Sequence, residues 1–262
     1  MKRNIVLPLL LCLLLTACGQ AKSPAANGVE LHVFAAASMT ETLDQIIQLY
    51  KEEAPGVTVV PTYDSSGTLL TQIQEGAECD LFLSAAPKQM NALEEADALL
   101  EGTRLDLLEN KVVLAVPEGN PGGASTFDRL AEMLEGGDIL LAVGNSDVPV
   151  GQYTLKIFAY YGLDEAALAA SGVLTYGSNV KEVTTQVSEG TVDCGVIYAT
   201  DAFSAGLAVA DEAVAEMCGQ VIYPAAVLKD SAHPEEARAF LDFLSSPEAG
   251  AVFSGVGFTP LS

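Results

Sequence analysis

Short apolar runs rich in β-branched residues alternate along this chain with longer segments of helical periodicity, and this alternation limits the fold more than any other feature. Strands that alternate with helices form parallel sheets with helices on both faces, so the sequence predicts an α/β fold with mainly parallel sheets. The predicted strands are LHVFAAA (31–37), VTVVPTY (57–63), DLFLSA (80–85), KVVLAVP (111–117), ILLAVG (139–144), CGVIYAT (194–200) and VIYPAAVL (221–228).

Two segments between the predicted strands have the apolar spacing of an amphipathic helix. Apolar residues follow the i, i+3, i+4, i+7 pattern over residues 43–50 and again over residues 237–244. Ser246 followed by Pro247 is typical of an N-cap and a first helical residue, which predicts one more helix near the C-terminus.

Glycine and proline cluster at residues 117–123, PEGNPGG, where we expect the chain to cross between two lobes. A return crossing near residues 219–224 would bring the C-terminal helices back to the first lobe. The predicted first lobe therefore comprises residues 29–116 plus 222–262, and the predicted second lobe comprises residues 117–221. Two such lobes would leave a cleft between them.

The N-terminal segment, residues 1–17, has the features of an export signal. Lys2 and Arg3 precede a leucine-rich core, and Leu-Thr-Ala-Cys at residues 15–18 forms a lipobox. We expect cleavage before Cys18, acylation of Cys18, and a flexible tether over residues 18–28. The protein would then be extracytoplasmic and held at the cell membrane by a lipid anchor, while an uncleaved anchor helix is the alternative.

The chain is strongly acidic, with a formal net charge of −23. Loss of Lys2 and Arg3 with the signal segment would make this charge −25. Such a charge argues against nucleic acid as a partner, and its even spread is typical of a solvated surface.

Three cysteines remain after the N-terminal region: Cys79, Cys194 and Cys218. An odd number provides no disulfide framework. The chain has no CxxC motif and no cluster of cysteine with histidine, so we predict no metal ligated directly by side chains and no cofactor.

Four predicted junctions between a strand and a helix carry groups that could donate hydrogen bonds to a ligand. In open α/β sheets, ligands bind beyond the carboxyl ends of the strands, where helices present unpaired N–H groups. An ordinary N-cap explains each junction taken alone, and Gly67 would let a ligand approach the backbone. The junctions are Ser38 with Glu41 as a capping box, Ser65 and Ser66 before Gly67, Val150 between Pro149 and Gly151, and Val180 between Asn179 and Glu182.

These junctions offer donors with almost no positive charge. The nearby cations are Lys156 and Lys181, which we expect on solvated surfaces. Helix N-termini and serine hydroxyls can hold an anion through neutral dipoles. A site of donors alone suits a fully deprotonated oxyanion and penalises a protonated one, whose O–H group would need an acceptor. This favours molybdate, tungstate or sulfate over phosphate.

From about residue 29 to its end, the chain resembles the periplasmic molybdate-binding protein family of ABC importers. The resemblance is carried by FAAASMTETL, SSGTL, DLFLSAAPKQM, LAVGNSDVPVGQY, VIYATDA and the closing GFTPL. It implies a two-lobed type II periplasmic-binding-protein fold that closes on one tetrahedral oxyanion, and a permease as partner. It also implies the ligand contacts: the backbone and hydroxyl groups of Ser38 and Ser66, the amides of Val150 and Val180, and the phenol of Tyr198.

The sequence departs from the family pattern at two of these positions. Gly67 stands where the family often has a third serine, and Val150 stands where alanine is common. We expect neither change to alter the class of ligand, and Gly67 to matter little. Tyr198 could equally be a packed strand end, and Asp201 is expected to cap the following helix.

Two other functions stay open. A serine hydrolase would need a base near its nucleophile, but the two histidines, His32 and His233, have structural contexts, and no GxSxG, Walker or strand-linked GxGxxG motif occurs. A binder of organic acids would use arginine, whereas Arg104, Arg129 and Arg238 lie away from the junctions.

Sulfate has the same charge and shape as molybdate. The sequence thus favours a monomeric, non-enzymatic protein that captures molybdate or tungstate.

Overall fold

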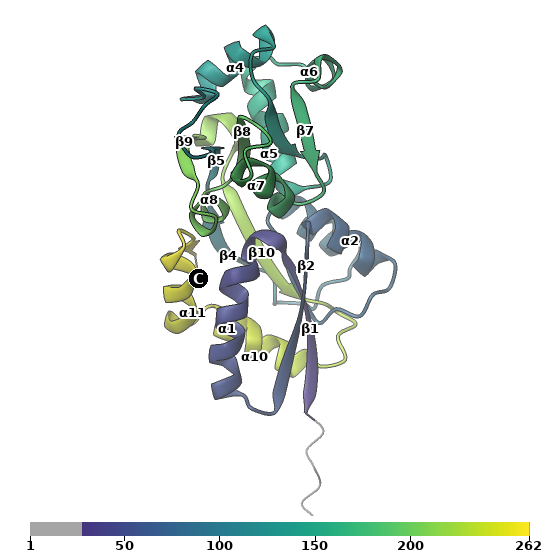
Figure 1. Ribbon diagram of the computed structural model, residues 1–262. Coiled ribbons are helices and arrows are strands. Elements are labelled where there is room, and N and C mark those ends of the chain that lie inside the picture. The colour runs from purple at the N-terminus through teal and green to yellow at the C-terminus, as the bar shows by residue number, and fades with distance from the viewer. Residues whose placement is uncertain (1–27, 262) are drawn as a thin grey trace, which may run out of the picture.

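The computed structural model describes residues 28–261, which form two α/β lobes, each built on one sheet. Figure 1 shows the lobes one above the other, with β10 running between them. The predicted signal peptide, Cys18 and the predicted tether up to residue 27 lie outside the described residues. Among residues 28–261, no helix combines the length and the apolar character that a membrane crossing needs.

The first sheet has the strand order β11-β4-β10-β3-β1-β2. Strand β1 pairs in parallel with β2 and β3, whereas β10 pairs antiparallel with β3 and β4, and β11 antiparallel with β4. The strands are β1 (Val29–Ala36), β2 (Val57–Asp64), β3 (Leu81–Leu83), β4 (Leu105–Asn110), β10 (Val221–Val227) and β11 (Thr259–Pro260).

The second sheet has the order β7-β6-β8-β5-β9. Strand β6 pairs in parallel with β7 and β8, and β5 pairs antiparallel with β8 and β9. The strands are β5 (Val112–Val116), β6 (Leu141–Gly144), β7 (Leu174–Gly177), β8 (Cys194–Tyr198) and β9 (Ala208–Glu212).

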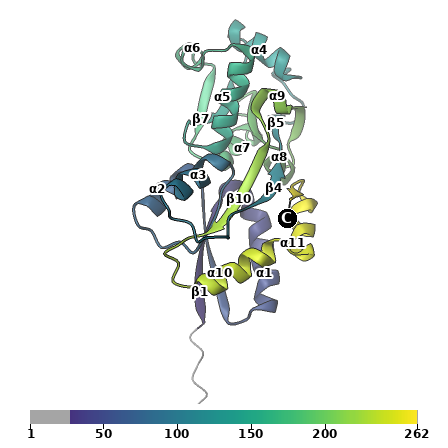
Figure 2. The same cartoon turned by 180° about the vertical axis from the view of Figure 1, so that it is seen from behind.

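Helices cover both faces of each sheet. In the first lobe, α1, α10 and α11 pack together on one side and α2 and α3 on the other (Figures 1 and 2). The first lobe carries the 3₁₀ helix η1 (Ala37–Met39), α1 (Thr40–Glu53), α2 (Ser66–Gln74), α3 (Pro87–Glu95), α10 (Pro234–Leu244) and α11 (Pro247–Gly255). The second lobe carries α4 (Phe127–Gly136), α5 (Pro149–Tyr161), α6 (Glu165–Ser171), α7 (Val180–Ser188), α8 (Ala199–Ser204) and α9 (Ala215–Cys218).

The α/β fold predicted from the sequence is confirmed, and each of the seven predicted apolar runs contains a strand. Both predicted amphipathic helices form, as α1 and α10, and Ser246 caps α11 by accepting a hydrogen bond from the Ala249 N–H at 3.2 Å. The sheets are mixed: most strands of each sheet run in one direction, as predicted, while β5 and β10, the strands next to the crossings, run against their neighbours.

The chain first passes between the sheets at Lys111, because β4 ends at Asn110 and β5 begins at Val112. This differs from the expected crossing at residues 117–123, and it places β5 in the second sheet. An extended backbone can run from one sheet directly into the next, so this crossing has no glycine or proline to mark it. The predicted division into lobes otherwise stays a prediction.

Strand β1 shows how the apolar pattern builds the core of the first lobe and the edge of its sheet that faces the second lobe. Leu31, Val33 and Ala35 are fully buried and join one core with Leu43 and Ile46 of α1. The strand then ends in small residues, and these small side chains leave room at the edge of the sheet that faces the second lobe.

Candidate oxyanion-binding site

A small cavity lies between the two lobes, at the end of β1 and β8. Its volume is about 10 Å³, which is room for about one water-sized sphere. Every residue that lines it is uncharged. They are Ala36, Ala37, Ser38, Ser65, Ser66 and Ala85 of the first lobe, and Val148, Pro149, Val150, Val180 and Tyr198 of the second.

All five residues predicted to contact a ligand line this cavity. Ser38 lies in η1, Ser66 is the first residue of α2, and Val180 is the first residue of α7. Val150 is the second residue of α5, and Tyr198 is the last residue of β8. The fold therefore gathers three helix N-termini, two serines and one phenol around a space without charge.

Local sequence explains why these helices begin where they do. Pro149 has no N–H group, so Val150 supplies the first backbone donor of α5. Asn179 caps α7 as predicted, because its Oδ1 accepts a hydrogen bond from the Glu182 N–H at 3.1 Å. Ser65 caps α2 by accepting from the Thr68 N–H at 3.1 Å.

The serine hydroxyls next to the cavity are held by groups distant in sequence. Ser66 Oγ accepts a hydrogen bond from the Ala85 N–H at 2.9 Å, and Ser38 Oγ lies 2.9 Å from Tyr223 Oη. Tyr198 Oη lies 3.5 Å from the Ala85 carbonyl oxygen. Burial raises the pKa of the Tyr198 phenol well above its usual 10, so the phenol stays protonated and can donate.

The capping box predicted for Ser38 and Glu41 is wrong. Helix α1 begins at Thr40, its N-cap is Met39, and no side chain caps it. Ser38 bonds to Tyr223 instead, and the Glu41 carboxylate reaches Lys181 of the second lobe. Both side chains thus serve contacts distant in sequence rather than their own helix.

Lys181 does not point into solvent as expected, because it joins the two lobes. Its Nζ donates to both carboxylate oxygens of Glu41, at 2.7 and 2.9 Å, and its side chain is 30 % exposed. The same Nζ lies 3.1 Å from Asp201 Oδ1. Burial lowers the pKa of Lys181, but Asp201 and Glu41 outweigh this effect and the pKa is raised. Lys156, in contrast, is exposed as expected.

Asp201 does not cap α8, contrary to expectation. The N-cap of α8 is Tyr198, and no side chain bonds to the first amides of the helix. The Asp201 side chain is fully buried, and among the described residues neither of its oxygens accepts a hydrogen bond of acceptable geometry. Burial therefore raises its pKa to about 6, and nearby Lys181 offsets only part of this shift.

Gly67 lies against the second lobe. A Cβ atom at this position would lie 2.2 Å from the Asp147 carbonyl oxygen, closer than any real contact. The absence of a side chain thus lets two backbones, one from each lobe, approach each other. The sequence predicts that Gly67 admits a ligand and that the absence of a third serine at this position matters little. In the structure, Gly67 instead contacts the other lobe.

A row of four aromatic rings lies beside the cavity, and the sequence did not predict it. Tyr153 packs edge to face against Tyr198, Tyr198 against Tyr223, and Tyr223 against Phe258, with ring centroids 6.4, 5.6 and 5.2 Å apart. These residues come from α5, β8, β10 and the closing GFTPL segment. The Tyr198 ring is therefore packed between rings from both lobes, which limits its orientation.

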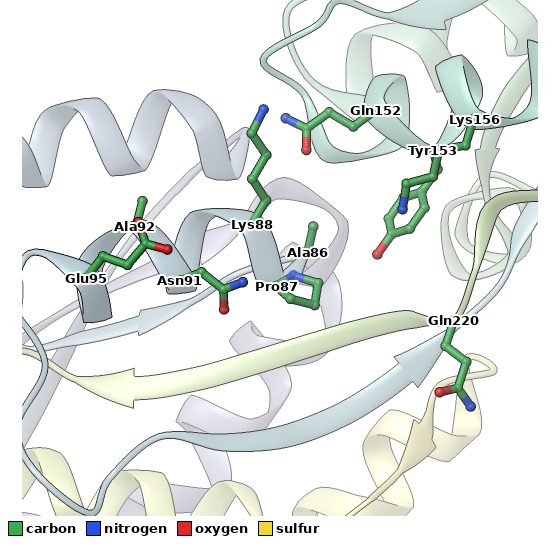
Figure 3. A pocket seen from close by; sticks show the side chains of 10 residues that line it. All are labelled: Ala86, Pro87, Lys88, Asn91, Ala92, Glu95, Gln152, Tyr153, Lys156 and Gln220. Carbon is green, nitrogen blue, oxygen red and sulfur yellow. The ribbon is translucent and has the colours of Figure 1, made fainter. Parts of the chain in front are cut away.

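A larger groove of about 620 Å³ lies between α3 and α5, beside the small cavity. Figure 3 shows Lys88 of α3 and Gln152 of α5 facing each other across it. Two residues connect the groove with the cavity. Ala86 lines the groove and follows Ala85, which lines the cavity, and Tyr153 lines the groove and packs against Tyr198. This groove is thus a large opening adjacent to the neutral cavity.

Neither histidine lines the cavity. His32 and His233 instead line a separate pocket of the first lobe, and His32 Nε2 lies 4.0 Å from Glu78. Cys79, Cys194 and Cys218 are free and buried, and residues 28–261 contain no group of acidic, histidine or cysteine side chains that could hold a metal ion.

Comparison with known proteins identifies the family. Residues 31–259 match the model of the bacterial extracellular solute-binding protein family. The chain belongs to this family. The match spans both lobes and all five predicted contact residues, and it confirms the resemblance at the level of the family.

Individual relatives of this solute-binding protein align over most of their length. A protein of Bacillus subtilis (strain 168) named as an ABC transporter substrate-binding lipoprotein, YvgL, is 33 % identical over 94 % of each chain. The molybdate-binding protein ModA of Escherichia coli (strain K12) is 33 % identical over 88 % of this chain and 89 % of its own.

A solved structure also resembles this solute-binding protein. It is the substrate-binding domain of a protein of Clostridium difficile described as a molybdenum ABC transporter. The two share 31 % identity with a TM-score of 0.66, over 90 % of this chain and all of the other. The family and these likenesses identify a binding protein rather than an enzyme.

Proposed function

We propose that this protein captures molybdate or tungstate between its lobes and delivers the anion to the permease of an ABC importer. What carries the proposal is the neutral cavity, where the five residues expected to contact a ligand meet. Two of the relatives described above are named for molybdate or molybdenum, which supports the same cargo.

The chemistry of the cavity favours an anion that only accepts hydrogen bonds. The amides of Val150 and Val180 lie at helix starts, where N–H groups have no partner within the helix. The hydroxyls of Ser38, Ser66 and Tyr198 add donors. An anion with a proton of its own would find few acceptors here.

Binding would need the lobes to part and close again, because the cavity as described has room for about one water-sized sphere. Strand crossings at Lys111 and at the start of β10 provide two places where the backbone could hinge. The closed form would then present a surface to the permease that the open form does not.

The lipid anchor and the docking surface are parts of the same proposal. We propose that acylated Cys18 holds the protein, as a monomer, at the outer face of the cell membrane, and that acidic residues on the exposed ends of both lobes meet basic loops of the permease. Charge reversal of those acidic residues should impair transport, and unchanged transport would contradict this docking surface.

Thermal unfolding of residues 19–262 with different anions tests the cargo. Molybdate, tungstate, sulfate, phosphate and no added anion would be compared. A ligand at about one hundred times its Kd adds about 2.7 kcal/mol to the free energy of unfolding. We expect a large rise in Tm with molybdate and tungstate alone. A comparable rise with sulfate would favour a sulfate binder of the same fold, and no rise with any anion would contradict the proposal.

A further inference from the structure

A buried chain of hydrogen bonds connects the two crossings between the lobes with Ser38. Asn110 is the last residue of β4, Tyr223 lies in β10, and Ser38 lies at the cavity. Asn110 Nδ2 lies 3.2 Å from Tyr223 Oη, which lies 2.9 Å from Ser38 Oγ. All three side chains are at most 5 % exposed, and Asn110 and Tyr223 do not line the cavity.

The direction of this chain follows from the partners of Asn110. Its Oδ1 accepts a hydrogen bond from the Lys111 N–H at 2.8 Å, which fixes the orientation of the amide. Its Nδ2 therefore donates its two hydrogens, one to Thr200 Oγ1 at 2.9 Å and one to Tyr223 Oη. An amide nitrogen has no acceptor capacity, so the Tyr223 oxygen must accept from it.

The remaining step sets the proton of Ser38. Burial raises the pKa of the Tyr223 phenol well above its usual 10, so the phenol keeps its single proton. Of the two side-chain hydrogen bonds recorded for Tyr223 Oη, Asn110 is the donor in one, so this proton is assigned to the other, toward Ser38 Oγ. The Ser38 proton then cannot point toward Tyr223, and it points into the cavity that Ser38 lines. Ser66 is oriented in the same manner, because the Ala85 N–H can only donate to its Oγ.

We propose that Asn110 and Tyr223 are specificity-determining positioning residues, which turn the Ser38 proton into the cavity and so favour a fully deprotonated oxyanion. This inference rests on the proposed function and deepens it. A free serine hydroxyl can donate to one ligand and accept from another. These hydrogen bonds fix Ser38 as a donor, so its hydroxyl can donate to any anion but cannot accept from one. Hydrogenphosphate, whose own O–H group needs an acceptor, therefore gains less from Ser38 than a fully deprotonated anion does.

A double-mutant cycle measured by calorimetry tests the inference. Molybdate affinity would be compared for the wild type, Tyr223→Phe, Ser38→Ala and the double variant. Phenylalanine keeps the ring that packs on Tyr198 and Phe258 but removes the donor to Ser38. We expect Tyr223→Phe to weaken molybdate binding about tenfold, and to have less than a twofold effect when Ser38 is already alanine.

Two further variants separate this role from a structural one. Asn110→Asp can only accept, so the Tyr223 proton turns toward it and Ser38 must donate to Tyr223 and not to the ligand. We expect a larger loss of molybdate affinity here, with a smaller preference for molybdate over phosphate in competition. Thr200→Val removes the other partner of Asn110 and leaves the chain to Ser38 intact, so that preference should stay unchanged.

The outcomes distinguish this inference from the proposed function. If Tyr223→Phe leaves molybdate affinity unchanged, or weakens it equally in the Ser38→Ala background, the inference is overturned while the proposed function stands. A wild-type protein that binds neither molybdate nor any other tetrahedral oxyanion contradicts both.

Discussion

At the scale of single residues, Ser65 and Ser66 are adjacent and identical, yet they use their hydroxyls differently. Ser65 caps its own helix through the Thr68 N–H, whereas Ser66 accepts from the Ala85 N–H and is fully buried. One hydroxyl serves local structure. The other binds a distant amide, and its proton is left for the cavity.

Replacing Ser66 by alanine should therefore affect both stability and binding. The buried Ala85 N–H loses its acceptor, so we expect the free energy of unfolding without ligand to fall by about 1 to 3 kcal/mol. Molybdate affinity should fall about tenfold or more, because a donor is lost as well. Urea denaturation and calorimetry measure the two effects, with Ser254→Ala on the exposed side of α11 as control. Unchanged affinity would show that Ser66 is only structural.

Gly67→Ala should hold the lobes apart. The added Cβ would overlap the Asp147 carbonyl oxygen, and relief of such overlap typically costs about 1 to 3 kcal/mol. We expect molybdate affinity to fall about tenfold to a hundredfold, because the closed form is the one that is disfavoured. Gly56→Ala is the matched control, since its Cβ would meet nothing within 4 Å. Equal affinities for the two variants would contradict the closure contact.

Asp201 makes a specific contribution to the pH dependence of stability. Its pKa is raised from 3.8 to about 6, so between about pH 4 and pH 6 the folded protein keeps a proton that the unfolded chain has lost. Raising the pH through this window therefore lowers the free energy of unfolding, by up to about 3 kcal/mol.

The variant Asp201→Asn should remove this dependence. The free energy of unfolding of the wild type minus that of the variant should decrease as the pH rises from 4 to 7, as measured by urea denaturation at each pH. A constant offset between the two proteins would reflect only the lost contact with Lys181. A difference that grows with pH would contradict the raised pKa.

At the scale of secondary-structure elements, the start of α7 meets η1 and α1 across the interface between the lobes. Helix α7 contacts η1 directly, and Lys181 of α7 binds Glu41 of α1. Val180, which precedes Lys181, lines the cavity. The ion pair and the predicted ligand contact therefore belong to the same helical turn, so the proposed closure of the lobes would bring both into place.

Lys181→Met should weaken ligand binding without changing any group that lines the cavity. Methionine keeps an unbranched side chain but cannot bind Glu41 or Asp201, so the closed arrangement loses a partly buried ion pair. We expect molybdate affinity to fall about threefold to tenfold, since such pairs contribute about 1 kcal/mol. Lys229→Met is the control, because Lys229 pairs with Asp97 inside the first lobe. An equal effect of both variants would show a general influence of charge.

At the scale of the whole molecule, the net negative charge opposes the proposed capture of an anion, although the cavity itself is neutral. The chain carries a formal net charge of −23, and a dianion that approaches it is repelled. The groove beside the cavity carries Lys88 and Lys156, but also Glu95. At low ionic strength the screening length, about 30 Å at 0.01 M, spans the protein, so the net charge outweighs these two lysines.

The association rate of molybdate should therefore rise with ionic strength. We expect the rate constant to increase when sodium chloride is raised from about 0.01 to 0.15 M, because screening weakens the repulsion. Stopped-flow tyrosine fluorescence can follow this, since the chain has 8 tyrosines and no tryptophan. A rate that falls with salt would mean that Lys88 and Lys156 attract the anion over the distance that limits capture.

The sequence alone determined the fold class, seven of the strands, the caps of α7 and α11, and membership of the solute-binding protein family, whereas β4, β7, β9 and β11 were not predicted. Periodicity and capping depend on residues within a few positions of one another, so the chain reveals them directly. The five predicted contact residues also meet in one cavity, although their binding of an anion stays a prediction.

Only the tertiary structure decided how the polar groups around that cavity are used. Ser38 and Tyr223 are 185 positions apart, and Glu41 and Lys181 are 140 apart. In both pairs a contact between distant elements replaced the local role that the sequence favoured, a capping box in one and solvent exposure in the other. The physical reason is that a buried hydroxyl or charge needs a partner, and packing of the two sheets determines which partner comes within reach.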